Sequence, residues 1–81
     1  MDQDRKPFAE PVEISLDGET REIADTVAAR DLLMSTNWPG PRDAAHDAAL
    51  DACLKVLDGH RSVVDARDAF LAAAVDAGLA R

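Results

Sequence analysis

The chain has 81 residues, with 16 acidic against 9 basic side chains, which gives a formal net charge of −7. A chain of this length forms one small domain around a single core. The negative charge repels phosphate backbones, so the composition disfavours nucleic-acid binding and favours a basic protein partner.

The N-terminal half has the pattern of a short strand. Residues 1–9 are mostly polar and include Pro7, and we expect them to form a flexible tail of which only Phe8 can dock on the core. Residues 10–81 are predicted to form a single small α+β domain. Within it, apolar residues alternate with polar ones, as in a half-buried strand, at Val12, Ile14 and Leu16.

A tight turn is predicted at Asp17-Gly18, because glycine adopts positive φ without steric cost. The chain then returns in a second strand from Glu19 to about Ile23. The apolar pattern of this second strand is weak, so the register of the hairpin stays open.

A rigid break separates the first helix from the second. Asp25 or Thr26 caps a first helix that is predicted to run to about Ser35. The segment Trp38-Pro39-Gly40-Pro41 then interrupts the chain, because proline cannot continue a helix. We expect Trp38 to cover the junction between the two halves of the chain and Gly40 to be the N-cap of the second helix.

Glycines mark the ends of the two longer helices. The second helix is predicted to end at Gly59, and the third to run from a capping box at Ser62 and Asp65 to Gly78. The short connection between them implies an antiparallel helical hairpin. The predicted fold is therefore a β-hairpin followed by three helices (ββααα), with the helices packed on one face of a two-stranded antiparallel sheet.

The third helix carries a second apolar stripe, about 120° from its core stripe. Its members are Val64, Leu71 and Val75. A small chain has few elements to cover every side of one helix, so this stripe is either covered by the hairpin or exposed as a contact surface. We interpret it as an interaction face, for a homodimer or for a partner protein.

His46 and Cys53 share one face of the second helix, as a base and a nucleophile or two metal ligands would. Seven residues span about 10.5 Å of helical rise, which is too far for a direct hydrogen bond between the two side chains. We therefore predict no catalytic residue, no metal site and no cofactor. The alternative is a small-ligand or metal-binding regulator with a pocket lined by Trp38, Arg42 and His46.

The expected cellular compartment is inferred from the absence of a disulfide pair, a signal peptide and a membrane-spanning segment in the sequence. The single cysteine, Cys53, excludes an intramolecular disulfide, and no apolar segment follows the charged N-terminus as it would in a signal peptide. The longest apolar run, Ala69 to Val75, is too short to span a bilayer. We expect a cytoplasmic protein without membrane contact.

Several spaced residues resemble a small family found mainly in alphaproteobacteria, domain of unknown function 982. They are Trp38-Pro39-Gly40-Pro41-Arg42, Ala45-His46, Ala49, Cys53-Leu54, Leu57, Gly59, Ala66-Arg67, Phe70, Ala73-Ala74 and Ala77-Gly78. The resemblance covers about residues 8 to 79, and this chain has Asp43 where the family often has glycine. It implies a shared fold but brings no established activity or cofactor. We expect a non-enzymatic protein-interaction or accessory module that is able to self-associate.

Overall fold

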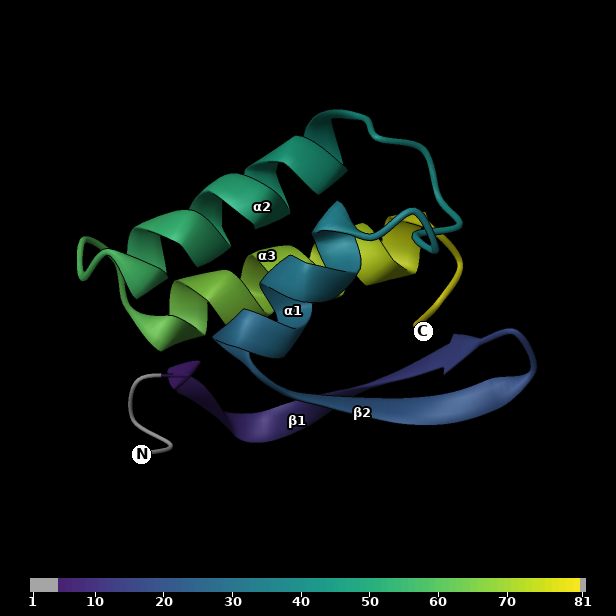
Figure 1. The fold of residues 1–81 in the computed structure, drawn as a ribbon, viewed down its shortest axis with the longest axis horizontal. Coiled ribbons are helices and arrows are strands. Elements are labelled where there is room, and N and C mark those ends of the chain that lie inside the picture. Colours follow the sequence, from purple (N-terminus) through teal and green to yellow (C-terminus); the bar gives the residue numbers. More distant parts are fainter. Residues whose placement is uncertain (1–4, 81) are drawn as a thin grey trace.

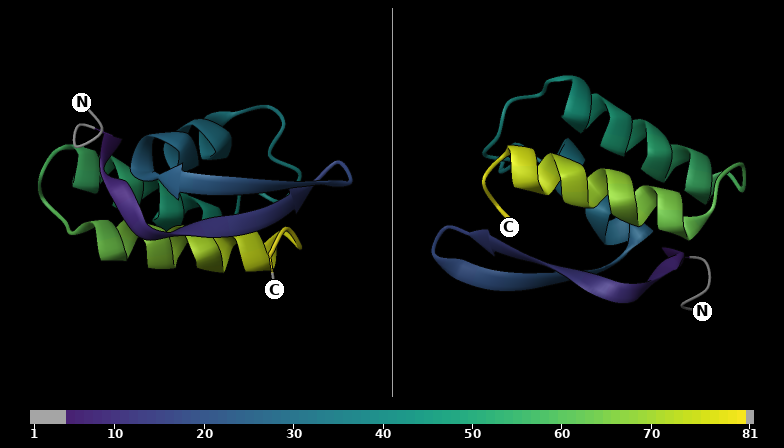
Figure 2. Two further views of the ribbon diagram at one scale, coloured as in Figure 1. Left: turned by 90° about the horizontal axis from the view of Figure 1, so that it is seen from below. Right: turned by 180° about the vertical axis from the view of Figure 1, so that it is seen from behind.

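The computed structural model describes residues 5–80 and shows a two-stranded antiparallel sheet covered on one side by three helices (Figure 1). The elements are β1 (Pro7–Leu16), β2 (Glu19–Asp25), α1 (Thr26–Met34), α2 (Ala44–Leu57) and α3 (Val63–Asp76). The predicted ββααα order is confirmed. Helices α1 and α3 lie next to the sheet, α1 over β2 and α3 over β1, while α2 packs on both of these helices from the far side (Figures 1 and 2).

The hairpin closes through the predicted two-residue turn, in which Asp17 has φ 53° and Gly18 has φ 80°. Positive φ at both central residues matches the right-handed twist of the flanking strands. Leu16 therefore lies opposite Glu19, and the pairing continues in register to Val12 opposite Ile23. The register that the sequence left open is thus the one that a two-residue loop dictates.

The N-terminal boundary differs from the prediction. Strand β1 begins at Pro7 and Phe8 is buried, so residues 7–9 belong to the sheet and not to a tail. A register shift between Pro7 and Val12 interrupts the alternation of side chains, which is why the apolar pattern does not reveal this part of the strand. Residues 1–4 of the expected tail lie outside the described residues.

The start of α1 is as predicted and the start of α2 is not. The Asp25 carboxylate accepts a hydrogen bond from the N–H of Ala28 at 2.7 Å and caps α1. Helix α2 begins three residues later than expected, with Asp43 as N-cap in place of Gly40. A Cβ atom on Gly40 would lie 2.4 Å from the Cβ atom of Ala77, so the loop is packed against the end of α3 before the helix begins.

Of the remaining predicted helix ends, two are confirmed and one is not. Both predicted glycine ends are confirmed: His60 N–H donates to the Lys55 carbonyl and Leu79 N–H to the Ala74 carbonyl, each at 2.8 Å, in the Schellman pattern. The capping box at Ser62 is wrong, because this N-cap makes no side-chain hydrogen bond and Asp65 pairs with Arg61 at 3.3 Å. Asp65 thus forms a surface ion pair with Arg61 and not a capping box with Ser62.

The core lies between the sheet and the helices and is centred on Phe70, which is fully buried. Its other buried members come from every element: Phe8, Val12, Ile14, Leu16, Ile23, Ala29, Leu33, Trp38, Ala49, Cys53, Val56, Ala66, Ala73, Ala74 and Leu79. Within residues 5–80, no helix is both long enough and apolar enough to cross a membrane.

Candidate functional site

The structure brings Trp38, Arg42 and His46 together at the end of α1. Trp38 is 5% exposed and His46 4% exposed, and their ring centroids lie 5.6 Å apart. The indole also faces the Phe70 ring at a centroid distance of 6.4 Å. The indole of Trp38 therefore packs between the His46 ring of α2 and the Phe70 ring of α3.

Arg42 and His46 bond to the last carbonyl groups of α1. The guanidinium donates from Nη1 to the Leu33 carbonyl at 2.9 Å and from Nη2 to the Ser35 carbonyl at 2.7 Å. His46 Nε2 lies 2.7 Å from the same Leu33 oxygen, and because a carbonyl only accepts, this nitrogen carries the hydrogen. Carbonyls at a helix end have no partner within the helix, and a cation there is favourable. These contacts hold α1 against α2.

Two buried nitrogens of this cluster have no hydrogen-bond partner among the described residues: Trp38 Nε1 and His46 Nδ1. The nearest carboxylate to His46 Nδ1 is that of Asp47, at 3.7 Å, which is beyond hydrogen-bond distance. None of Trp38, Arg42 or His46 lines the three grooves described below.

Cys53 is fully buried and His46 is 4% exposed, so neither the thiol nor the imidazole considered in the sequence analysis is open to solvent. Burial raises the pKa of the Cys53 thiol to about 11, against a smaller opposite effect of the Arg30 charge. A thiol with this pKa is protonated at neutral pH and is a poor nucleophile. In residues 5–80, no three His, Cys, Asp or Glu side chains are grouped so as to hold a metal ion.

The second apolar stripe of α3 is covered in its middle and open at both ends. Val64 is 62% exposed and Val75 47% exposed, whereas Leu71 is half-buried beside β1. Leu71 lines a groove of about 550 Å³ between α3 and β1. Val64 and Val63 line a second groove of about 210 Å³ at the other end of β1. The hairpin thus covers only part of the predicted interaction face.

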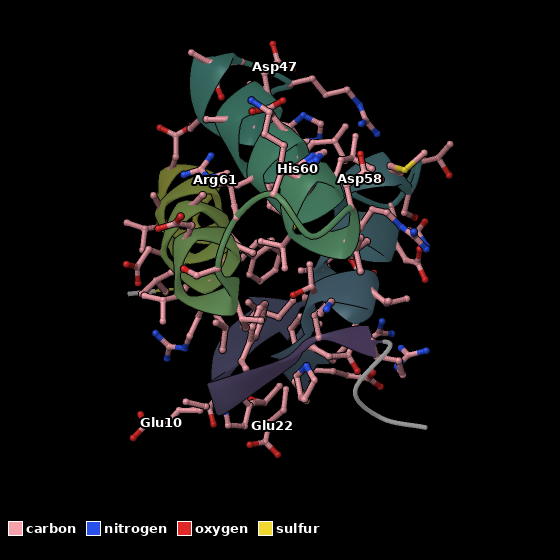
Figure 3. The ribbon with its side chains drawn as sticks, turned by 90° about the vertical axis from the view of Figure 1, so that its left-hand side faces the viewer. Glu10, Glu22, Asp47, Asp58, His60 and Arg61 are labelled. Atoms are coloured by element: carbon pink, nitrogen blue, oxygen red, sulfur yellow. The ribbon has the colours of Figure 1, made fainter. Side chains whose placement is uncertain are left out.

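The outer face of the sheet is acidic. The net charge of the chain does not predict that acidic residues gather on this face. Glu13 lies directly opposite Glu22 in the strand pairing, and both side chains are exposed. Figure 3 shows Glu22 and Glu10 projecting from the sheet on the side away from the helices. Like charges directly opposite each other destabilise a sheet. The repulsion between Glu13 and Glu22 therefore does not help the protein to fold.

Two contacts at the outer edge of β1 were also missed. Ser15 N–H donates to the Leu79 carbonyl at 2.8 Å, and Arg67 Nε donates to the Glu10 carbonyl at 2.8 Å. Both join residues that are far apart in the chain, and no local pattern in the sequence signals them. Together they close the outer edge of β1.

The comparisons with known proteins agree with this architecture. The solution structure by NMR of Agrobacterium tumefaciens protein Atu1219, a structural-genomics target, is 33% identical to this chain with a TM-score of 0.80. The match covers 100% of this chain and 81% of that one. The search of curated proteins found no match. Residues 10–81 match the family described as protein of unknown function (DUF982), and the chain belongs to this family.

Proposed function

We propose that this protein is a non-catalytic interaction module of the cytoplasm that self-associates through α3. The observation that supports the proposal is the exposure of Val64 and Val75, at 62% and 47%, on one line along the helix. Exposed apolar side chains that share one helix face are typical of contact surfaces. The burial of His46 and Cys53, which could have served as base and nucleophile, also favours binding over catalysis by these groups.

A two-fold contact is the simplest arrangement for such a face, because it needs only one self-complementary patch. Val64 and Val75 lie near opposite ends of α3. An antiparallel pair of α3 helices places Val64 of one copy against Val75 of the other. Leu71, which lies between them, then approaches the two-fold axis while it stays packed against β1 of its own copy.

The test is the substitution Val75→Asp, followed by sedimentation velocity and native mass spectrometry. We expect the unmodified protein to be a dimer and the variant to dissociate about tenfold more readily, since an unpaired carboxylate in an apolar contact is strongly unfavourable. The helical circular dichroism should not change, because Val75 is half-exposed in the monomer.

Met34→Asp is the matched control. Met34 is 60% exposed on α1, so the substitution adds the same charge to an equally open apolar position on another element. It should leave the dimer intact. A parent protein that stays monomeric at millimolar concentration contradicts self-association, as does equal dissociation of the two variants.

The alternative function is a small-ligand or metal-binding regulator with its site at Trp38, Arg42 and His46. In its favour are two buried nitrogens, Trp38 Nε1 and His46 Nδ1, that have no hydrogen-bond partner within residues 5–80. Against it, the rings of Trp38 and His46 are buried and packed against each other, and the guanidinium of Arg42 bonds to carbonyl groups at the end of α1. The interaction face on α3 is therefore the better supported site.

A further inference from the structure

The two edges of the sheet differ in whether their outward backbone groups are hydrogen-bonded. The outer edge of β1 is closed by Leu79, whose carbonyl accepts from Ser15 N–H, and by Arg67, which donates to Glu10. Unpaired strand edges are sites where another strand can add, and proteins commonly cover them. Here one edge is covered by α3 and the segment that follows it (Figure 2).

The outer edge of β2 is open. Ser15 directs its N–H away from β2, and Thr20 is its partner in the pairing, so Thr20 directs its own backbone groups away from β1. Glu22 lies two residues further along and points the same way. Among residues 5–80, none bonds to the outward backbone groups of Thr20 or Glu22. The strand therefore offers a row of free donors and acceptors.

Helix α1 projects past this edge and forms a groove with it. The left view of Figure 2 shows α1 extending beyond β2 on the side away from β1. The groove has a volume of about 390 Å³. Its lining combines apolar side chains with two acidic and two basic residues: Leu16, Ile23, Ala28 and Leu32, with Asp17, Asp31, Arg5 and Arg21. A third strand beside β2 would place every second side chain in this groove, under α1, and the others on the outer face of the sheet.

The charges around the open edge of β2 indicate the charge that a partner strand should carry. Glu13, Asp17, Glu19 and Glu22 all lie on the hairpin, and none of them forms an ion pair with any residue in the described range 5–80. Opposite charges on neighbouring strands stabilise strand pairing, whereas like charges weaken it. Pairing of β2 with β2 of a second copy would bring together two strands that each carry three acidic residues and one basic residue, Arg21. A basic strand fits the edge and this chain's own β2 does not.

We propose that the open edge of β2 and the groove under α1 bind an extended basic segment of a partner protein as a third strand. Backbone hydrogen bonds to Thr20 and Glu22 provide the register, and apolar side chains of the segment enter the groove. Its lysine or arginine side chains lie on the outer face beside Glu22. This is strand addition of the kind by which sheet edges recognise peptides. The surface is separate from the face on α3, so the proposal does not depend on self-association.

The test uses a synthetic, end-capped peptide of alternating lysine and valine, titrated into the full chain and followed by NMR. We expect saturable binding and slower hydrogen exchange at the amides of Thr20 and Glu22. Glu22→Lys should weaken binding about fivefold by turning a cross-strand attraction into a repulsion. This variant should fold, because it also replaces the repulsion between Glu13 and Glu22 with an attraction.

Three controls separate strand addition from general attraction to an acidic protein. Asp68→Lys changes the net charge equally on α3 and should weaken binding by less than about twofold, because distant surface charges are screened. A peptide with N-methylated backbone keeps its charge and should not bind. Val75→Asp should leave binding unchanged. The proposal is overturned by the absence of saturation, by equal weakening in both lysine variants, or by unprotected amides at Thr20 and Glu22.

Discussion

At the scale of single residues, two carboxyl groups meet where α2 begins and α3 ends. The His46 N–H, together with a hydrogen bond to Asp76, lowers the pKa of the Asp43 carboxyl. The same hydrogen bond and the repulsion from Asp43 raise the pKa of Asp76 above its ordinary value of 3.8. Asp76 is also the last residue of α3, where a negative charge opposes the helix dipole. It is therefore the unfavourable member of the pair.

Asp76→Asn should raise the melting temperature at neutral pH. It removes the negative charge that repels the Asp43 carboxylate and leaves an amide that can donate a hydrogen bond to it. Since the folded-state pKa of Asp76 is raised, its protonated form stabilises the fold at low pH, and this contribution is lost as the pH rises through the folded-state value. The advantage of the variant should thus shrink as the pH falls toward 3.8. Asp58→Asn, at the C-cap of α2, controls for the removal of a negative charge from the end of a helix.

At the scale of elements, Gly40 shows how the loop before α2 is packed on α3. A Cβ atom at this position would lie 2.4 Å from the Cβ atom of Ala77 and 3.2 Å from Trp38 Nε1. The close approach fixes the indole over the core and delays the start of α2 to Asp43. The requirement for glycine here is steric and comes from another element.

Gly40→Ala should lower the free energy of unfolding by about 2 kcal/mol, a usual cost of overpacking. Gly40→Ala combined with Ala77→Gly should recover most of that loss, because the second change removes the atom that clashes. Urea denaturation of the parent, both single variants and the double variant measures the coupling. Additive effects of the two substitutions would show that the contact is not what requires glycine.

The elements also show where sequence reasoning succeeds. The order ββααα, the turn at Gly18 and the ends at Gly59 and Gly78 depend on neighbouring residues, and local patterns predict them. The N-cap at Asp43 was missed because Gly40-Pro41 has the composition of a helix start, whereas packing on Ala77 decides the boundary. Likewise, Trp38, Arg42 and His46 were expected to meet, but their bonds to the end of α1 depend on tertiary structure.

At the scale of the whole molecule, the N-terminal segment ties the sheet to the helices. The Lys6 carbonyl accepts from both the backbone N–H and the hydroxyl of Thr26, at 3.0 and 2.9 Å, and Thr26 is fully buried. Beside it, Arg5 Nε donates to the Asp25 carboxylate at 2.9 Å. Asp25 thus holds the start of β1 and caps α1 at once. A single carboxylate connects the first strand to the first helix.

Asp25→Asn isolates the charge of this connection, because asparagine can still cap α1. Partial burial raises the pKa of Asp25, but Arg5 and the N–H groups of Ala28 and Val27 outweigh it, so the pKa lies below 3.8. A lowered folded-state pKa means that the carboxylate stabilises the fold above about pH 4 and that this contribution is lost as the pH falls through the folded-state value.

The variant should therefore be less stable than the parent at neutral pH by about 0.5 to 1 kcal/mol, since the guanidinium is half-exposed and solvent screens the pair. The two stabilities should converge in acid, where the parent's carboxylate is protonated as well. Urea denaturation at a series of pH values measures the difference. Arg30→Gln removes an ion pair with Asp31 within α1 and controls for the loss of one surface salt bridge. A difference between parent and Asp25→Asn that does not change with pH would show that the bond to Arg5 contributes nothing through its charge.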